Sequence, residues 1–429
     1  MLRFISLDQD QPGKRPAPAR GGDFREIYAS YAAEKAAAQA SRCSQCGVPF
    51  CQVHCPLGNA IPDWLKLTAE GRTREAYELS QSTNNMPEIC GRICPQDRLC
   101  EGNCVIEQSG HGTVTIGAIE KHLTDTAWRE GWVAPLVPRR ARPQRVAVIG
   151  AGPAGLACAE QLRVQGYRVT VYDRYERAGG LLMYGIPGFK LEKDIVKRRV
   201  KRLAEGGIKF KLGCEIGRDL SFAELRSRHD AVFVAAGAYR ARAMEIDGLA
   251  ALDYLISGTP NAKDKHVAVI GGGDTAMDCV RTAIRQGAAS VTCLYRRDRE
   301  NMPGSLREVV NAEEEGVAFE WLTLPKSRFG DGVRISRMRL GLPDASGRKA
   351  PEEIGGADFT LHSDIVIKAL GFDPEPQWKA LIAQDGVFAG GDVMRGASLV
   401  VWAIRDGRDA ARNIHLYLEK QAEHLKAAE

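Results

Sequence analysis

The crowding of cysteines near the front of this chain is its most constraining feature. Eight of the 12 cysteines fall between Cys43 and Cys104, within 62 residues. No run of about 18 or more apolar residues predicts a transmembrane helix, and the first residues lack the apolar segment of a secretion signal. We therefore expect a cytoplasmic protein with no membrane partner, in which crowded cysteines act as metal ligands. The other four are scattered: Cys158, Cys214, Cys279 and Cys293.

The spacing of the crowded cysteines favours iron–sulfur clusters. The first set reads Cys43-x2-Cys46-x4-Cys51-x3-Cys55-Pro56, and the second reads Cys90-x3-Cys94-Pro95 followed by Cys100 and Cys104. Three close cysteines, a more distant fourth and a Cys-Pro pair are typical of iron–sulfur ligation. Zinc is the main alternative, but zinc ribbons prefer two Cys-x2-Cys pairs and only one is present. Structural thiols are a further alternative.

Length and charge narrow the class of protein. A chain of 429 residues predicts two to four domains, and 44% apolar with 26% charged residues is ordinary for a soluble globular protein. The net charge of +5 is small for this length, so it does not indicate a nucleic-acid partner.

Two β-strand–helix–β-strand units carry glycine fingerprints for dinucleotides. In the first, an apolar strand over 145–149 leads into Gly150-Ala-Gly152-Pro-Ala-Gly155, a helix, and a strand over 168–173. In the second, a strand over 266–270 leads into Gly271-Gly-Gly273-Asp-Thr-Ala276, a helix, and a strand over 290–295. Such loops expose backbone N–H groups at a helix N-terminus, where a pyrophosphate binds.

The ends of the second strands predict different nucleotides. Asp173 can accept hydrogen bonds from ribose hydroxyls and repels a 2′-phosphate, which suits FAD or NAD. Arg296 and Arg297 occupy the matching place in the second unit, and two guanidinium groups suit the 2′-phosphate of NADPH. Two dinucleotide sites in one chain indicate a flavoprotein reductase.

Later segments extend this interpretation. In flavoproteins with two dinucleotide units, a Gly391-Asp392 pair of this kind contacts the flavin ribityl chain and phosphate, and the segment opening at Arg395-Gly-Ala-Ser398 predicts a helix aimed at the flavin. The strand ending at Gly237 would close the first half of this unit, so an inserted second unit would split the first. We also expect residues 1–22 to form a tether, and Asp23 to cap a helix that reaches about Arg42.

Five long segments, 43–56, 89–104, 179–191, 271–278 and 396–408, closely resemble the small (beta) subunit of NADPH-dependent glutamate synthase. Related modules occur in dihydropyrimidine dehydrogenase and in NADH-dependent ferredoxin:NADP oxidoreductase. The resemblance implies an α/β fold: a helical iron–sulfur domain (1–140), an FAD domain split into 141–258 and 362–429, and an NADPH domain (259–361) inserted between the halves.

The resemblance and the fingerprints together assign the cofactor-binding residues. FAD is expected at Gly150, Gly152, Pro153, Ala154, Gly155, Asp173, Gly180, Leu181, Gly237, Gly391, Asp392, Ala397, Ser398 and Leu399. NADPH is expected at Gly271, Gly273, Asp274, Thr275, Ala276, Arg296 and Arg297. No acid–base residue is expected, because hydride transfer between two cofactors requires only alignment.

For the metal, the resemblance implies two [4Fe-4S] clusters with crossed ligands. Cys43, Cys46, Cys51 and Cys104 would hold one cluster; Cys55, Cys94 and Cys100 would hold the other. In the relatives the eighth ligand is a helix-borne side chain that falls on Glu120 here, whereas spacing alone nominates Cys90. We favour Glu120, with Cys90 as the alternative.

The resemblance implies an electron-input subunit. It would oxidise NADPH and supply a large (alpha) subunit, carrying FMN and an iron–sulfur cluster, that makes glutamate from glutamine and 2-oxoglutarate, so a hetero-oligomer is expected. The alternatives are the same module serving ferredoxin or another redox partner, and a non-catalytic redox sensor. The chain departs from the family at two short joints, near 257–265 and 373–385, and loss of strands at the second is expected to expose core.

Overall fold

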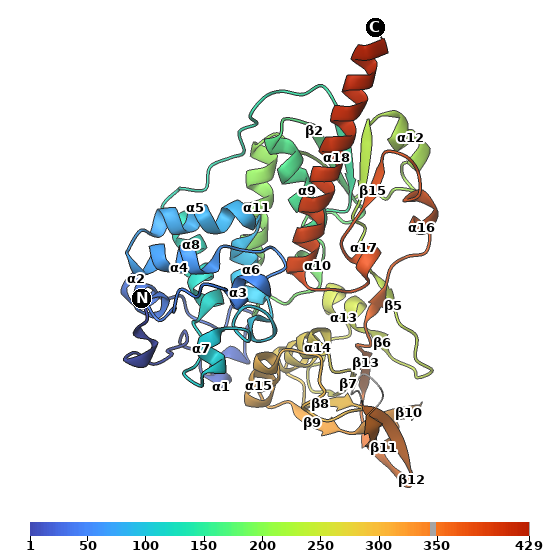
Figure 1. Cartoon of the computed structure of the whole chain (residues 1–429). Coiled ribbons are helices and arrows are strands. Elements are labelled where there is room, and N and C mark those ends of the chain that lie inside the picture. The colour runs from blue at the N-terminus through green and yellow to red at the C-terminus, as the bar shows by residue number, and fades with distance from the viewer. Residues whose placement is uncertain (344–348, 429) are drawn as a thin grey trace.

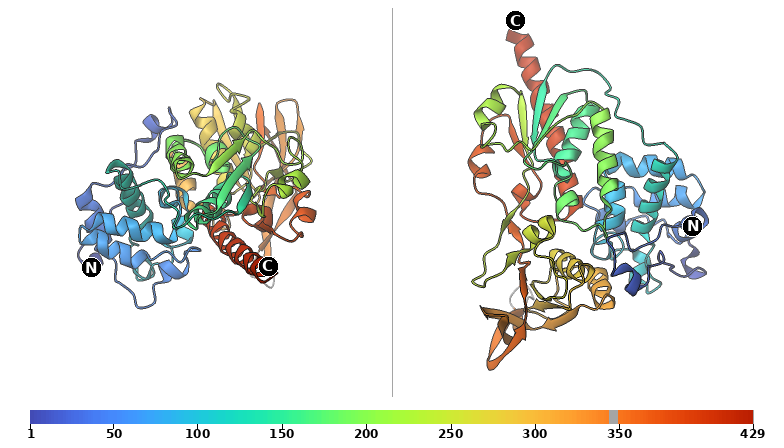
Figure 2. Two further views of the ribbon diagram at one scale, coloured as in Figure 1. Left: turned by 90° about the horizontal axis from the view of Figure 1, so that it is seen from above. Right: turned by 180° about the vertical axis from the view of Figure 1, so that it is seen from behind.

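The computed structural model describes residues 1–343 and 349–428, with side chains up to residue 424. Three parts meet near the middle of the molecule: an N-terminal helical domain and two domains built on parallel sheets (Figure 1). Seen from above and from behind, the N-terminal helices lie to one side of the two sheets (Figure 2). Within the described ranges, none of the helices has the length and apolarity needed to cross a bilayer.

The N-terminal domain is a group of short helices around a small core. Trp64, Leu65, Ile119 and Leu123 are buried at its centre. Gly91 lets two of the helices approach closely, because a Cβ there would lie 2.7 Å from the backbone nitrogen of Lys121. The helices are α2 (Ala33–Ala40), α3 (Phe50–Val53), α4 (Ile61–Ala69), α5 (Thr73–Thr83), α6 (Pro87–Ile93), α7 (Val105–Gln108) and α8 (Ile116–Arg129).

The first sheet has the strand order β15-β4-β1-β2-β3, and all its pairings are parallel. Its strands are β1 (Arg145–Ile149), β2 (Arg168–Asp173), β3 (Lys209–Leu212), β4 (Ala231–Val234) and β15 (Val387–Ala389). The helices on its faces include α9 (Pro153–Val164), α11 (Lys193–Glu205) and α18 (Val400–Ala428). Helix α18 packs along α9 so closely that a Cβ on Gly407 would lie 2.2 Å from the carbonyl oxygen of Ala154.

The second sheet has the order β6-β13-β7-β8-β9 and carries an antiparallel extension, β10-β11-β12. Its strands are β6 (Leu249–Ala250), β7 (His266–Ile270), β8 (Ser290–Tyr295), β9 (Ala318–Trp321) and β13 (Ile365–Lys368); its helices are α13 (Ala251–Ser257), α14 (Asp274–Arg285) and α15 (Leu306–Glu314). The extension comprises β10 (Thr323–Phe329), β11 (Gly332–Pro343) and β12 (Lys349–His362). Since β15 returns to the first sheet, the second domain is inserted into the first, and the expected fold class is confirmed.

The second sheet reaches beyond the range expected for the inserted domain. Strand β6 precedes residue 259, and β13 follows residue 361 yet pairs in parallel with β7. A short apolar strand such as Ile365–Lys368 fits either parallel sheet, so its sequence could not decide which it would join. The two domains are further connected by a two-stranded ribbon of β5 (Arg240–Ala241) and β14 (Phe372–Asp373).

Two expectations about local structure were wrong. No helix starts at Asp23: its carboxylate pairs with Arg15 at 2.6 Å, and the first long helix begins only at Ala33. Residues 1–22 are also no free tether, because α1 (Ala17–Arg20) lies against the second sheet domain with Arg20 buried.

The short joint near 373–385 does not leave the first sheet uncovered. The joint contains a short helix, α16 (Trp378–Leu381). Its Trp378 is buried in the same apolar cluster as Ile216 and Val387, so a large side chain covers core residues at this joint.

A buried ion pair joins the N-terminal domain to the first sheet domain. Arg199 of α11 forms two hydrogen bonds to Glu88 of α6, Nε–Oε1 at 2.6 Å and Nη2–Oε2 at 2.8 Å, and both side chains are fully buried. Burial alone would raise the pKa of Glu88, but the charge of Arg199 outweighs it and the pKa is lowered. The pair is therefore ionised at neutral pH.

We predict that Arg199→Met lowers the free energy of unfolding by about 3–5 kcal/mol, because it leaves the Glu88 carboxylate buried and unpaired. The matched control is Lys197→Met in the same helix, which removes an exposed pair with Asp194 and costs less than about 1 kcal/mol. Urea unfolding measures both. Equal losses in the two variants would contradict the prediction, and the double variant Glu88→Met with Arg199→Met should recover much of the loss.

Candidate functional site

A cleft of about 260 Å³ runs between the two sheet domains, and we call it the cofactor cleft. The carboxyl ends of β1, β2 and β4 face it, which is where ligands bind in open α/β sheets. Ten of the residues predicted for FAD line it: Gly150, Gly152, Pro153, Ala154, Asp173, Leu181, Gly237, Asp392, Ser398 and Leu399. Gly155, Gly180, Gly391 and Ala397 do not line it but directly adjoin residues that do.

The first glycine loop has the geometry of a phosphate cradle. Gly150 has φ +104°, and a Cβ there would lie 2.2 Å from the carbonyl oxygen of Ala235. A Cβ on Gly180 would lie 2.8 Å from the Cα of Gly152, so the two backbones touch. No side chain caps the N-terminus of α9 at Gly152. The free N–H groups there fit a pyrophosphate.

Asp173 stands at the end of β2 beside this loop. Its Oδ2 accepts a hydrogen bond from Ala151 N at 2.6 Å, and its Oδ1 accepts one from Tyr175 N at 2.8 Å. Burial raises the pKa of Asp173, although both backbone contacts oppose the shift. Each oxygen keeps a lone pair, so the carboxylate still fits ribose hydroxyls.

Aromatic side chains that the sequence reasoning missed line the same end of the cleft. The guanidinium of Arg174 lies 4.6 Å from the ring centroid of Tyr239, and Tyr175 packs 4.6 Å from Tyr184. Arg174 also pairs with Glu375 at 2.7 Å. The sequence could have indicated two of these residues, because Arg174 and Tyr175 directly follow Asp173.

At the far side of the cleft, Asp392 and Ser398 are in contact. Asp392 Oδ1 accepts hydrogen bonds from Ser398 Oγ at 2.6 Å and from Ser398 N at 3.2 Å. Burial raises the pKa of Asp392 to about 6. Helix α18 begins two residues later, at Val400, so its N-terminus points toward the cleft that Leu399 and Val400 line.

The second glycine loop repeats the first in outline. Gly271 has φ +143°, a Cβ on Gly272 would meet the ring of Tyr295 at 2.4 Å, and the space around Gly273 is open. Helix α14 begins at Asp274 without a side-chain cap, with Ala276 buried in its first turn. Of the predicted NADPH residues, Asp274 and Thr275 line the cofactor cleft. The loop fits a second pyrophosphate.

Arg296 and Arg297 follow β8, at the edge of the second sheet. Arg296 is exposed, and Arg297 is half-buried with no hydrogen-bond partner for its Nε among the described residues. Both guanidinium groups fit a 2′-phosphate at this place.

The predicted metal ligands line two separate cavities. The first, which we call the outer cysteine cavity, has Cys43, Cys46, Cys51 and Cys104 in its wall. The second, the inner cysteine cavity, has Cys55, Cys94 and Cys100. In the described part of the chain, no group of three or more His, Cys, Asp or Glu side chains is placed to hold a single metal ion.

Both candidates for the eighth ligand, Glu120 and Cys90, line the inner cysteine cavity. Glu120 Oε1 accepts hydrogen bonds from Asn59 Nδ2 at 3.1 Å, Asn84 Nδ2 at 3.2 Å and Ser80 Oγ at 3.4 Å. Cys90 Sγ lies 3.8 Å from Asn84 Oδ1. The three hydrogen bonds from Asn59, Asn84 and Ser80 orient the carboxyl group of Glu120 within the cavity wall.

The cofactor cleft and the two cysteine cavities lie in series. Cys94 and Val401 line the inner cysteine cavity, while their chain neighbours Pro95 and Val400 line the cleft. Ile116 lines both cysteine cavities. Only single residues therefore separate one site from the next.

Comparison with known proteins assigns both halves of the chain. Residues 20–132 match the family described as dihydropyrimidine dehydrogenase domain II, 4Fe-4S cluster. Residues 144–407 match the pyridine nucleotide-disulphide oxidoreductase family. The fold is shared with Mycobacterium tuberculosis FprA in complex with NADPH, at a TM-score of 0.59 and 19% identity over 66% of this chain and 86% of that one.

Two full-length relatives are the glutamate synthase [NADPH] small chains of Azospirillum brasilense and Escherichia coli K12. The first is 59% identical over 99% of this chain and 97% of its own length; the second is 45% identical over 98% and 99%. The Azospirillum alignment spans 469 positions against 429 residues here, so at least 40 positions have no counterpart in this chain.

The two short joints predicted near 257–265 and 373–385 would likewise make this chain shorter than its relatives. The chain carries a 4Fe-4S domain joined to a flavoprotein-type, NADPH-dependent oxidoreductase fold. It belongs to the family of glutamate synthase [NADPH] small chains.

Proposed function

We propose that this chain is the electron-input subunit of a glutamate synthase, acting in the cytoplasm. Bound FAD would accept a hydride from NADPH, and two [4Fe-4S] clusters would pass the electrons singly to an FMN-containing large subunit that makes glutamate from glutamine and 2-oxoglutarate. The observation that carries the proposal is the serial arrangement of the cofactor cleft, the inner cysteine cavity and the outer cysteine cavity.

Each site offers the chain groups that its cofactor requires. The uncapped N-termini of α9 and α14 would hold the two pyrophosphates, with Asp173 on the flavin ribose side. We assign Arg296 and Arg297 to the 2′-phosphate of NADPH. Cys43, Cys46, Cys51 and Cys104 would hold the outer cluster, and Cys55, Cys94, Cys100 and Glu120 the inner one.

The surface around the outer cysteine cavity supports transfer to a protein partner. Phe50 and Val105 line that cavity and are also partly exposed, and Val48 and Val53 beside them are 62% and 65% exposed. Exposed apolar side chains gathered at one place are typical of a docking surface. We propose that the large subunit binds there, since the outer cysteine cavity lies farthest along the series.

The chain itself supplies alignment and no proton transfer. FAD and NADPH would supply the hydride chemistry themselves, so the walls of the cofactor cleft would need only to hold them in contact and exclude water. The apolar side chains of Leu181, Leu252 and Leu399 line the cleft and serve this purpose.

Two other functions make different predictions. The same reductase module could serve ferredoxin or another acceptor, which would be identified by the protein that co-purifies with this chain. A redox sensor that performs no turnover would leave the flavin absorbance unchanged when NADPH is added.

Our first functional prediction separates reduction from onward transfer. Anaerobic NADPH should bleach the flavin absorbance of the wild-type holoprotein, and the FMN-loaded large subunit should restore it. Val53→Asp, at an exposed position that does not line the outer cysteine cavity, should slow only the restoring step, by about tenfold or more, because a charge at the docking surface weakens the complex. Val137→Asp, an exposed position in the linker after α8, is the control and should behave as wild type. Absence of bleaching in the wild type would rule out the function.

The 2′-phosphate assignment predicts a change of cofactor preference. Arg297→Met should weaken NADPH binding about 10- to 100-fold, because a charge-assisted hydrogen bond contributes about 1.5–3 kcal/mol. NADH affinity should stay within twofold, which provides an internal control. Isothermal titration calorimetry on the holoprotein measures both, and an equal loss for the two nucleotides would show that the arginine acts elsewhere.

The eighth ligand can be tested with two matched variants. Cys90→Ala should keep about eight iron atoms per chain, whereas Glu120→Ala should lose about four or change the electron paramagnetic resonance signal of one reduced cluster. Iron analysis and spectroscopy after anaerobic reconstitution provide the measurement. The reverse pattern would make Cys90 the ligand.

A further inference from the structure

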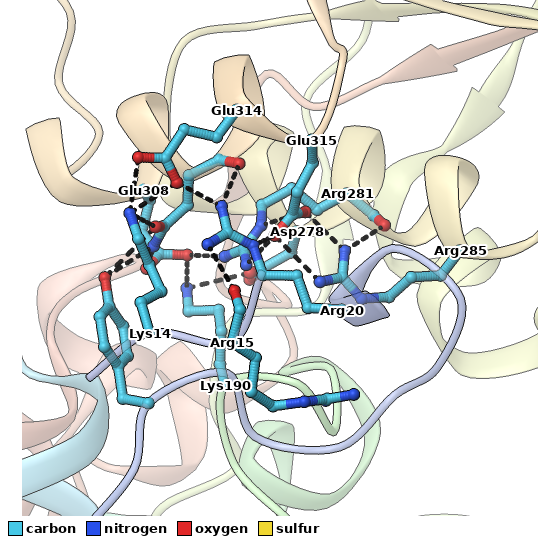
Figure 3. Close-up of polar contacts among 12 residues, drawn as sticks. Lys14, Arg15, Arg20, Lys190, Asp278, Arg281, Arg285, Glu308, Glu314 and Glu315 are labelled. Atoms are coloured by element: carbon cyan, nitrogen blue, oxygen red, sulfur yellow. Dashed lines mark hydrogen bonds and ion pairs between the residues drawn. The ribbon is translucent and has the colours of Figure 1, made fainter. Parts of the chain in front are cut away.

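Residues 1–22, which we call the N-terminal arm, contact the second sheet domain through one buried arginine. The side chain of Arg20 is 1% exposed and belongs to α1, yet it pairs with two consecutive residues almost 300 positions away in the sequence. Its Nη2 lies 2.5 Å from Glu314 Oε2, and its Nε donates to Glu315 Oε1 at 2.9 Å (Figure 3). The end of α15 is therefore tied to the arm.

Glu315 carries this contact onward to α14, the helix that begins at the NADPH glycine loop. Arg281 and Arg285 of α14 pair with Glu315 at 2.8 Å and 2.6 Å, and these side chains are fully buried (Figure 3). Burial alone would raise the pKa of Glu315, but the two arginines outweigh it and lower the pKa to about 2. The carboxylate is charged at neutral pH, so Arg20 is connected to α14 by ion pairs through Glu315. We call this connection the first brace.

A second brace, also an ion pair, reaches α14 from the first sheet domain. Lys190 lies 2.9 Å from Asp278 Oδ1 on α14 and 3.7 Å from Glu308 Oε2 on α15 (Figure 3). Lys190 and Asp278 both line the cofactor cleft, from opposite domains. The pair thus spans the cleft beside the place where the two dinucleotide sites meet.

A third contact fixes the beginning of α15. Asp97, in the 3-10 helix Gln96–Arg98, accepts hydrogen bonds from Ser305 Oγ at 3.2 Å and from Leu306 N at 3.3 Å. Ser305 N in turn donates to Asp274 Oδ1 at 3.0 Å, at the start of α14. Helix α15 is therefore held by the N-terminal domain at both ends.

We propose that Arg20 and Lys190 are positioning residues for hydride transfer, which hold α14 and the nucleotide on its glycine loop at one orientation to the flavin site. The inference rests on the proposed function. Hydride transfer requires reacting atoms about 3–3.5 Å apart, and a displacement of about 1 Å can cost about 100-fold in rate. The direct link between the two sheet domains, the β5–β14 ribbon with the strand crossings beside it, has the architecture of a hinge, so the two braces act together with the Asp97 contact to fix the orientation of α14 and α15.

The test separates orientation from nucleotide affinity. Arg20→Met should slow flavin reduction by NADPH about tenfold in stopped-flow measurements, while the dissociation constant for NADP⁺ stays within twofold, because no predicted nucleotide-binding residue is changed. Arg20→Lys should recover most of the rate. Lys190→Met should also slow flavin reduction, but Lys190 lines the cofactor cleft, so the comparison of rate with affinity is made with the Arg20 variants.

A readout independent of turnover is hydrogen exchange. In Arg20→Met the amides of 306–316 and 274–285 should exchange faster than in wild type, while those of the first sheet do not change. Arg334→Met, which removes an exposed pair with Asp358 inside the second domain, is the control and should match wild type in every measurement. If Arg20→Met does not fold, Glu314→Gln weakens the outer contacts with both Arg20 and Lys14 and should slow reduction about two- to threefold.

The outcomes distinguish this proposal from the proposed function. A wild-type flavin that NADPH does not reduce would overturn both. A wild-type flavin that is reduced, with variants that reduce equally fast or lose NADP⁺ affinity in proportion to rate, would overturn the positioning role alone.

Discussion

The buried pair of Glu88 and Arg199 fixes the segment on which the rest of the arrangement depends. This segment, residues 87–98, comprises α6 and the turn after it. Its first turn is bound to α11 of the first sheet domain, Pro95 reaches the cofactor cleft, and Asp97 reaches α15 of the second domain. Cys94 stands between the first two contact points, Glu88 and Pro95, in the wall of the inner cysteine cavity. One short segment therefore sets the relation of a metal site to both dinucleotide sites.

The features that could be predicted from the sequence are those determined by residues close together in the chain. The motifs Gly150–Gly155 and Gly271–Ala276 run from the end of a strand into the first turn of a helix as expected, because tight turns and close backbone approach leave few residue types that fit. The two cysteine sets also separate into two cavities as grouped by the resemblance. A spacing rule nominates Cys90 and overlooks Glu120, since it does not register that α6 and α8 touch at Gly91 and bring both side chains to one cavity.

The parts that were missed depend on residues far apart in the chain. Asp23 has the composition of a helix cap, but Arg15 competes for its carboxylate, so the segment stays extended. Residues 1–22 contain several prolines and glycines and read as a tether, although Arg20 is among the most buried side chains in the molecule. Its partners, Glu314 and Glu315, lie in an ordinary acidic helix end. Nothing local distinguishes a solvent-exposed arginine from one that fills a buried acidic site.

The concentration of buried charge at the domain boundaries argues for orientation over stability. Burying ions costs several kcal/mol each before their attraction offsets it, and apolar replacements of equal volume are often as stable. Apolar contacts, however, tolerate sliding, whereas ion pairs between Arg20, Glu315 and Arg281 satisfy their hydrogen bonds at one relative position. An apolar boundary would suffice for a protein that only had to fold. A chain that must keep a nucleotide, a flavin and a metal site in series gains from contacts that fail when the domains shift by an ångström.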